Sequence, residues 1–172
     1  MSDLKELLDF TKGAARSARH ANGEGKDKPN ESDASAEDYC PAYGYLRGIR
    51  ERALSLEVRF RDGNSDWFPY SWLGPVRFNP SVGLLLKFTG DTMILVLIRG
   101  SNLDTLVNQS INLTDRGIGR HRILWLREMD EEEMRQAGNA KPTIDRIEVA
   151  EFDAQEDLQE WLKKNAPVFL RQ

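Results

Sequence analysis

The chain has a single cysteine, Cys40, and only two histidines among its 172 residues. One cysteine excludes a disulfide within the chain and any zinc site built from several thiolates. No apolar run approaches the roughly 20 residues that a membrane-spanning helix needs, and the longest, 93–98, has the length of a strand. The N-terminus, MSDLKELLDF, carries acids where a secretion signal has a basic start and then an apolar stretch. We therefore expect a cytoplasmic protein with no membrane partner.

The motifs of the common enzyme classes are missing as well. The sequence contains no G-x-S-x-G elbow, no phosphate-binding P-loop and no dinucleotide fingerprint. His20 and His121 lie far apart, and neither is close in sequence to a nucleophile that it would activate. The acidic run 130–133 stands where the positive end of a helix attracts carboxylates in any case. We predict a non-catalytic protein that uses no metal and no cofactor.

Hydropathy divides the chain into three parts. Residues 1–20 carry a short leucine stripe and are expected to form an amphipathic helix. Residues 21–39 hold six acids against two bases and almost no large apolar side chain, which is typical of a disordered acidic linker. Residues 43–165 have enough apolar residues for a core and are predicted to form a single α+β domain.

The clearest local signal is a strand followed by a turn. Leu54, Leu56, Val58 and Phe60 alternate with polar residues, and Asp62-Gly63 follows, a pair that suits a hairpin turn. Pro69 lacks an N–H group, so the next strand is expected at a sheet edge or at a bulge. Further strands are predicted at 76–78, 84–88, 93–99, 121–128 and 143–152, with 121–128 in a central position.

Three helices are expected in the same domain. Ser101 and Asp104 read as a capping box for a helix that buries Leu103, and Asp130 with Glu133 reads as a second one. Asp153 and Glu156 are predicted to cap a final helix whose inner face carries Leu158, Trp161 and Leu162. These elements predict a strongly curved antiparallel sheet or incomplete barrel of five to seven strands, closed by two or three short helices.

Charge is distributed unevenly along the domain. Residues 40–128 hold twelve bases, eleven of them arginine, against eight acids, whereas residues 129–172 hold six bases against eleven acids. An arginine-rich central surface is therefore expected. In the loop from Arg116 to Arg122, two glycines would let backbone N–H groups approach an anion while arginine side chains grip it. The candidate ligand-binding or anion-binding residues are Arg59, Arg61, Arg99, Arg116, Arg120, His121 and Arg122.

Several functions remain open at this point. The first is a non-catalytic binding or adaptor module that meets a protein partner through the arginine-rich surface. The second is a single-stranded nucleic-acid-binding domain, with Phe68, Tyr70 and Trp72 stacking bases between arginines, although the same aromatics suit a core equally well. The third is a homo-oligomeric assembly protein, in which the acidic segment 129–172 of one copy covers the basic segment 40–128 of the next. If the two segments instead meet within one chain, they neutralise each other.

Overall fold

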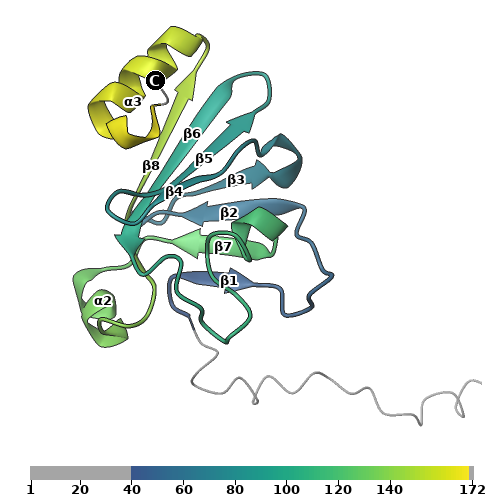
Figure 1. Ribbon diagram of the computed structural model, residues 1–172, viewed down its shortest axis with the longest axis vertical. Coiled ribbons are helices and arrows are strands. Elements are labelled where there is room, and N and C mark those ends of the chain that lie inside the picture. Colours follow the sequence, from purple (N-terminus) through teal and green to yellow (C-terminus); the bar gives the residue numbers. More distant parts are fainter. Residues whose placement is uncertain (1–39, 171–172) are drawn as a thin grey trace, which may run out of the picture. The chain divides into compact units, whose positions relative to one another are not determined.

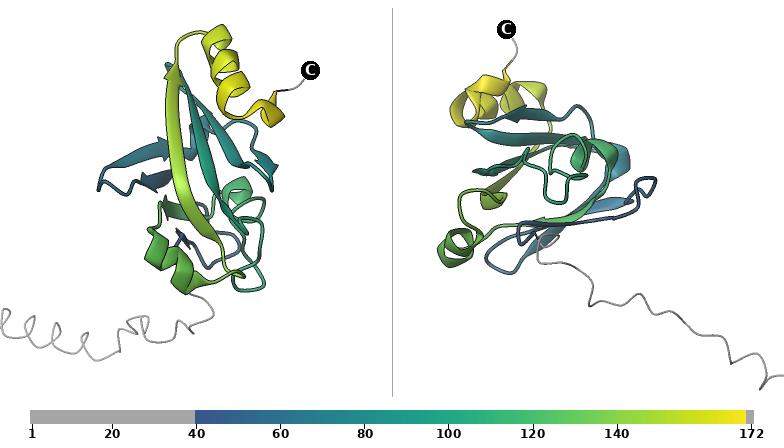
Figure 2. Two further views of the ribbon diagram at one scale, coloured as in Figure 1. Left: turned by 90° about the vertical axis from the view of Figure 1, so that its left-hand side faces the viewer. Right: turned by 60° about the horizontal axis from the view of Figure 1, so that its bottom comes forward.

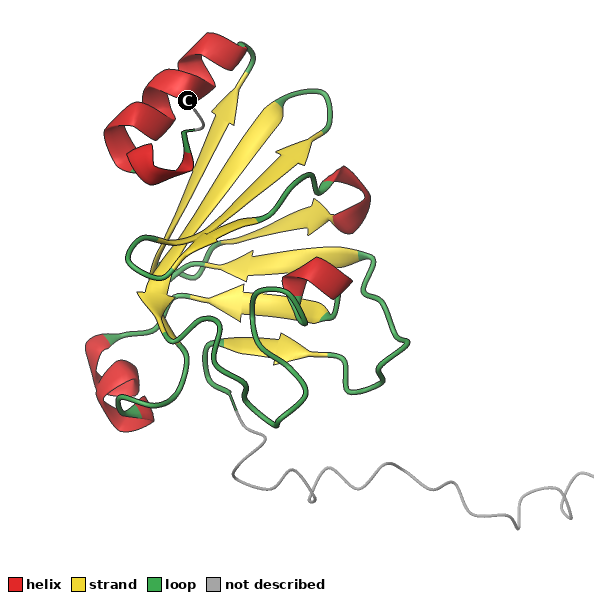
Figure 3. Cartoon of the chain, in the orientation of Figure 1, coloured by secondary structure: helices red, strands yellow, loops and turns green. Residues whose placement is uncertain are grey.

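The structure, a computed structural model, describes residues 40–170. The helix predicted at 1–20 and the linker predicted at 21–39 lie outside the described residues. Within this range the chain is α+β, with eight strands in two four-stranded sheets and two α-helices. Figure 1 labels the elements and Figure 3 colours them by type. The strand count exceeds the predicted five to seven, and the sheets do not close on each other, so an incomplete barrel is not confirmed.

The first sheet, called sheet A here, has the strand order β1-β7-β2-β3. Its strands are β1 (Tyr43–Tyr45), β2 (Ser55–Arg59), β3 (Ser65–Pro69) and β7 (Ile123–Arg127). The hairpin predicted at Asp62-Gly63 is confirmed, because β2 pairs with β3 antiparallel and Gly63 has a φ of 92°. The edge position of Pro69 and the central position of β7 are confirmed as well. The pairing of β2 with β7 is parallel, which the antiparallel prediction missed.

The second sheet, sheet B, is antiparallel throughout, in the order β4-β5-β6-β8. Its strands are β4 (Arg77–Asn79), β5 (Gly83–Thr89), β6 (Met93–Ser101) and β8 (Thr143–Phe152). Consecutive apolar residues in β5 and β6 are buried on both faces of this sheet. One face meets sheet A, and the helix α3 (Gln155–Asn165) packs against the other, as the right-hand view of Figure 2 shows.

The main core lies between the two sheets. Inward-facing side chains of both sheets belong to one buried cluster, and the rings of Phe68 in sheet A and Phe88 in sheet B stack at 4.8 Å. The short 3-10 helix Tyr70–Trp72 follows β3 at once, and the Tyr70 hydroxyl donates to the carbonyl oxygen of Ile123 at 2.7 Å. Phe68 and Tyr70 are thus core residues rather than a base-stacking platform. Leu54, predicted to point inward, lies just before β2 and is 90% exposed.

No helix begins at Ser101, which is the last residue of β6. Residues 102–122 form an irregular segment, apart from the 3-10 helix Ile118–Arg120. Asn102 and Gln109 have φ values of 57° and 64°, which lie in the left-handed region and break a right-handed helix. The apolar residues of this segment still contribute to the main core, although not at helical spacing: these are Leu103, Ile111, Leu113 and Ile118.

The other two helices are present. The helix α2 (Glu131–Ala137) has the predicted capping box between Asp130 and Glu133 and ends before Gly138. In α3, Leu158 and Leu162 are buried as predicted, but its N-cap is Ala154 and no side chain caps it. The capping role predicted for Asp153 and Glu156 is therefore wrong. A final 3-10 helix, Pro167–Phe169, closes the described chain and packs with α3 on the outer face of sheet B.

Candidate functional site

The arginines predicted to form one binding surface have different surroundings, and the most buried of them is Arg122. Its exposed fraction is 2%, and its Nη2 donates to the carbonyl oxygens of Leu46 at 2.9 Å and Arg47 at 3.2 Å. No described atom accepts a hydrogen bond from its Nε. The Arg122 guanidinium is enclosed by the fold and binds backbone carbonyls, so it holds the 46–47 loop against the start of β7. An external ligand does not reach the guanidinium there.

Arg61 and Arg99 also bind backbone carbonyls, in both cases of the acidic C-terminal segment. Arg61 Nη2 donates to the carbonyl oxygens of Met129 at 2.6 Å and Asp145 at 3.1 Å. Arg99 Nη2 donates to Asn165 at 2.8 Å, and its Nε donates to the Glu148 carboxylate at 3.1 Å. These contacts join segment 40–128 to segment 129–172 within one chain, and the Arg99–Glu148 contact is an ion pair between a base of the first segment and an acid of the second.

The loop from Arg116 to Arg122 uses its backbone N–H groups internally. The amides of residues 118–122 all donate to backbone carbonyls of the same loop region, at 2.9–3.3 Å. Arg116 Nη1 lies 3.4 Å from the carbonyl oxygen of Gln109, and the ring of His121 stacks on Tyr70 at 4.6 Å. Arg120 is exposed and, within residues 40–170, its side chain makes no ion pair. Anion binding by this loop stays a prediction, and its satisfied amides do not favour it.

Arg59 lies in a different setting, on the outer face of sheet A. Its Cζ atom is 4.6 Å from the ring centroid of Trp125, and its Nη2 donates to Glu57 Oε2 at 2.7 Å. The indole of Trp125 lies against Gly44 of β1, where a Cβ atom would approach Trp125 Nε1 to 2.2 Å. Glycine is therefore required at position 44 for the indole to lie flat against the sheet. Trp125 is held between the β1 backbone and the Arg59 guanidinium.

A second tryptophan, Trp67, continues this row across the sheet. Glu57 is paired in register with Trp125 on one side and with Trp67 on the other, so the three side chains point out of the same face. Trp67 is 62% exposed, a large value for a tryptophan in a strand. We call this surface the tryptophan face, and it consists of Gly44, Glu57, Arg59, Trp67 and Trp125.

The charges of the tryptophan face are already paired. The hydrogen bond from Arg59 is the main reason why the pKa of Glu57 lies below its ordinary value of 4.5. At the border of the tryptophan face, Arg127 of β7 makes an ion pair with Glu133 of α2 at 2.7 Å. This contact lowers the pKa of Glu133 in the same way. The surface thus presents two indoles with a guanidinium whose charge is paired with a carboxylate, and the described residues give it no cluster of unpaired cations.

Neither α-helix of the described chain makes its main contacts with sheet A, although Glu133 of α2 pairs with Arg127 of β7. Both α2 and α3 contact β8, the outermost strand of sheet B. Figures 1 and 2 show α3 beside that sheet and α2 at its end. The tryptophan face is therefore a rigid sheet surface with exposed aromatic area.

The sequence contained a signal for Trp67 but not for its neighbours. Strand alternation placed Trp67 on the face opposite Phe68, so burial of Phe68 implies exposure of Trp67. Trp125 stands in the apolar run Ile123-Leu124-Trp125-Leu126, where a β-bulge opposite Gly44 and Tyr45 disrupts the alternation. Its place beside Arg59 depends on the parallel pairing of β2 with β7, which no local pattern predicts.

Comparisons with protein-family models, with curated proteins and with solved structures find no match to this chain. Within residues 40–170, no helix is long and apolar enough to cross a membrane. In the same range, no three histidine, cysteine, aspartate or glutamate side chains are grouped so that they could hold a metal ion. The geometry of the tryptophan face is thus the main guide to function.

Proposed function

We propose that the protein is a non-catalytic binding module that contacts a protein partner through the tryptophan face. The observation that carries the proposal is Trp67, 62% exposed on an open sheet face, in one row with Trp125 and Arg59. Tryptophan and arginine are enriched among the residues that dominate protein interfaces, and tryptophan provides a large contact area at a small entropic cost. A sheet holds them rigidly, which lowers the cost of binding further.

Electrostatics favours a protein partner over a nucleic acid. Binding to single strands requires cations that neutralise phosphates, together with aromatic rings that stack on bases. The rings are present, but Arg59 is paired with Glu57 and Arg127 with Glu133. A polyanion would have to displace these carboxylates, whereas a neutral protein surface would leave both ion pairs intact.

Self-assembly through the two charged segments has less support. That version needs the acids of segment 129–172 to be available for a second copy. Glu148 and Glu133 instead bind Arg99 and Arg127 of the same chain. The proposal therefore commits to a different chain as partner, and it includes the cytoplasmic location expected from the sequence, which fractionation of the producing cells would check.

Photo-crosslinking of the full chain tests the proposal in the cells that produce it. A benzophenone amino acid replaces Trp67 in one variant and Val168 in the control. Val168 is also exposed and apolar, at 49%, but lies in the 3-10 helix beside sheet B. We expect an adduct with one other protein from position 67 and not from position 168. A nucleic-acid adduct or a self-adduct at position 67 would overturn the proposal in favour of that class of partner, and identical adducts at both positions would remove it.

A further inference from the structure

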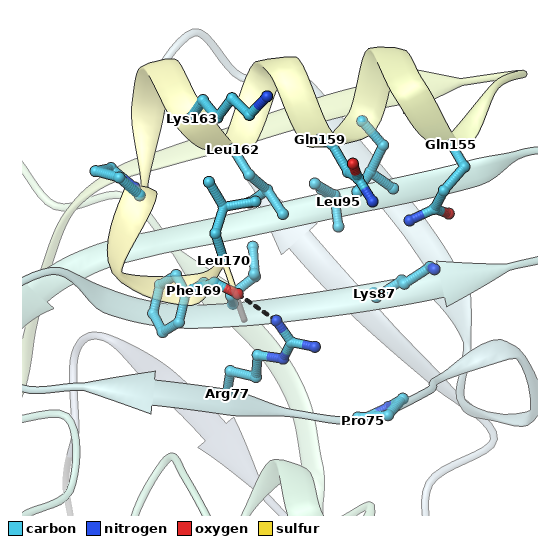
Figure 4. A pocket seen from close by; sticks show the side chains of 13 residues that line it. Pro75, Arg77, Lys87, Leu95, Gln155, Gln159, Leu162, Lys163, Phe169 and Leu170 are labelled. Atoms are coloured by element: carbon cyan, nitrogen blue, oxygen red, sulfur yellow. Dashed lines mark hydrogen bonds between the residues drawn. The ribbon is translucent and has the colours of Figure 1, made fainter. Parts of the chain in front are cut away.

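A groove lies on the other side of the molecule, on the outer face of sheet B. It has a volume of about 690 Å³ and is bounded by α3 and the 3-10 helix Pro167–Phe169 on one side and by β4, β5 and β6 on the other. Figure 4 shows this groove with its lining side chains. The volume falls within the range of about 300–1,000 Å³ that is usual for small-molecule sites.

Among the described residues, the lining combines apolar side chains with cations and contains no carboxylate. The apolar members are Pro75, Leu85, Leu95, Leu158, Leu162, Pro167, Phe169 and Leu170. The polar members are the cations Arg77, Lys87 and Lys163 and the amides Gln155 and Gln159. A surface of this composition attracts a molecule that is both apolar and negatively charged.

Arg77 shapes one part of the groove. Its Nη1 donates to the carbonyl oxygen of Phe169 across the groove, as the dashed line in Figure 4 shows. This contact fixes the 3-10 helix Pro167–Phe169 over β4 and β5. Leu85, Leu95 and Phe169 pack in the same buried cluster, so the wall of the groove is formed in the free protein.

Lys87 is the less exposed of the two lysines in the groove, neither of which makes an ion pair within residues 40–170. It lies in β5 two residues after Leu85, opposite Leu95 in register, and is half-buried. No carboxylate within residues 40–170 makes an ion pair with it. In Figure 4 the amides of Gln155 and Gln159 extend from α3 toward the strand that carries Lys87. An ammonium group next to leucines and without a counter-ion favours an anionic ligand, since such a ligand offsets the cost of partial desolvation.

We propose that this groove binds an amphipathic carboxylate with an unbranched acyl chain, of the fatty-acid class. The carboxylate pairs with the Lys87 ammonium and accepts hydrogen bonds from the Gln155 and Gln159 amides. The acyl chain lies beside α3 along Pro75, Pro167 and Leu170, the apolar lining residues that are not buried. The site is separate from the tryptophan face, so the substitution W67A leaves it unchanged.

Titration of the isotope-labelled full chain, followed by amide chemical shifts, tests the proposal with three ligands of equal chain length. These are decanoate, the neutral decanol and the cationic decyltrimethylammonium. We expect saturable shifts at the groove with decanoate, weaker binding of decanol and the weakest binding of decyltrimethylammonium. An equal affinity for the anion and the cation would overturn the proposal, and so would the absence of saturable shifts at the groove.

Two variants test the role assigned to Lys87. K87Q removes the ammonium group. Q159E places a carboxylate on α3, facing the Lys87 ammonium, at an exposed position where the fold tolerates polar changes. Each is expected to weaken decanoate binding about tenfold, since a charge-assisted hydrogen bond is lost or opposed. The matched control is K164Q. Lys164 lies on α3, as Gln159 does, and is exposed but does not line the groove.

The control is expected to bind decanoate as the unaltered chain does. Equal affinities in K87Q, Q159E and K164Q would overturn the assignment. A peptide rich in leucine and glutamate serves as the second probe. If this peptide shifts the amide signals of the groove and decanoate does not, the fatty-acid proposal is overturned in favour of a protein ligand.

Discussion

The outer faces of the two sheets differ in what covers them. On sheet B, Leu85, Leu95 and Leu97 point outward and are at most 4% exposed, because α3 packs on them. On sheet A, Trp67 and Trp125 point outward, and neither α-helix of residues 40–170 makes its main contacts with this sheet. Outward apolar side chains are therefore part of the core on one sheet and an available contact surface on the other. The outer faces of the two sheets thus differ in whether a helix covers them, and not in whether their strands carry apolar side chains.

The largest effect is expected where the covering helix is weakened. L162A removes a side chain of α3 that is 5% exposed, and the free energy of unfolding should fall by about 2–4 kcal/mol. The matched leucine on sheet A is Leu124, which is 39% exposed. L124A should cost less than about 1 kcal/mol. Chemical denaturation measures the loss of unfolding free energy in both variants. Equal losses would contradict the difference between the covered outer face of sheet B and the uncovered outer face of sheet A.

A smaller effect is expected when the indole of Trp125 is displaced. G44A places a methyl group where Trp125 now lies, at 2.2 Å from Nε1, so the indole must leave the Arg59 guanidinium. Overpacking of this kind costs about 1–3 kcal/mol. The control G119A adds a methyl group in ordinary contact, 3.6 Å from the nearest atom, and should change stability by less than about 1 kcal/mol. Tryptophan fluorescence and denaturation report both effects, and an unshifted indole spectrum in G44A would contradict the placement of Trp125.

The ion pair on the tryptophan face should give a modest pH dependence. The pKa of Glu57 is lowered in the folded state, chiefly by the hydrogen bond from Arg59, so folding is favoured by the charged carboxylate. This stabilisation is complete above the ordinary pKa of 4.5 and is lost as the pH falls through the lowered folded value.

The variant E57Q isolates this contribution. The difference in unfolding free energy between E57Q and the unaltered chain should be below about 1 kcal/mol at pH 7 and should shrink toward pH 3. Denaturation curves at both pH values measure it. A difference that is constant with pH would contradict the role of the Glu57 charge.

Much of sheet B and part of sheet A could be predicted from local patterns. Alternation from Leu56 to Val58 and the pair Asp62-Gly63 specified the β2–β3 hairpin, and Asp130 with Glu133 specified the start of α2. These signals lie within a few residues of the elements they define. The helix predicted at Ser101 failed, because the same residue types suit the irregular segment whose leucines fill the space between the sheets.

The candidate site depended on contacts that are distant in sequence. The parallel pairing of β2 with β7 places Trp125 beside Arg59, and 66 positions separate them. Three of the arginines expected on one surface, Arg61, Arg99 and Arg122, bind backbone carbonyl groups of segments far along the chain, as Arg61 does at Asp145. Charge counting identified the basic segment but could not show that some of its arginines hold distant segments of the fold together.

The substitution W67A tests the central claim most directly, because it separates binding from stability. We expect its unfolding free energy to stay within about 1 kcal/mol of that of the unaltered chain, since the side chain is largely exposed. Its affinity for the partner identified by crosslinking, measured by calorimetric titration, should fall about tenfold or more, while V168A binds normally. Unchanged affinity in W67A, or an equal loss in V168A, would contradict the account.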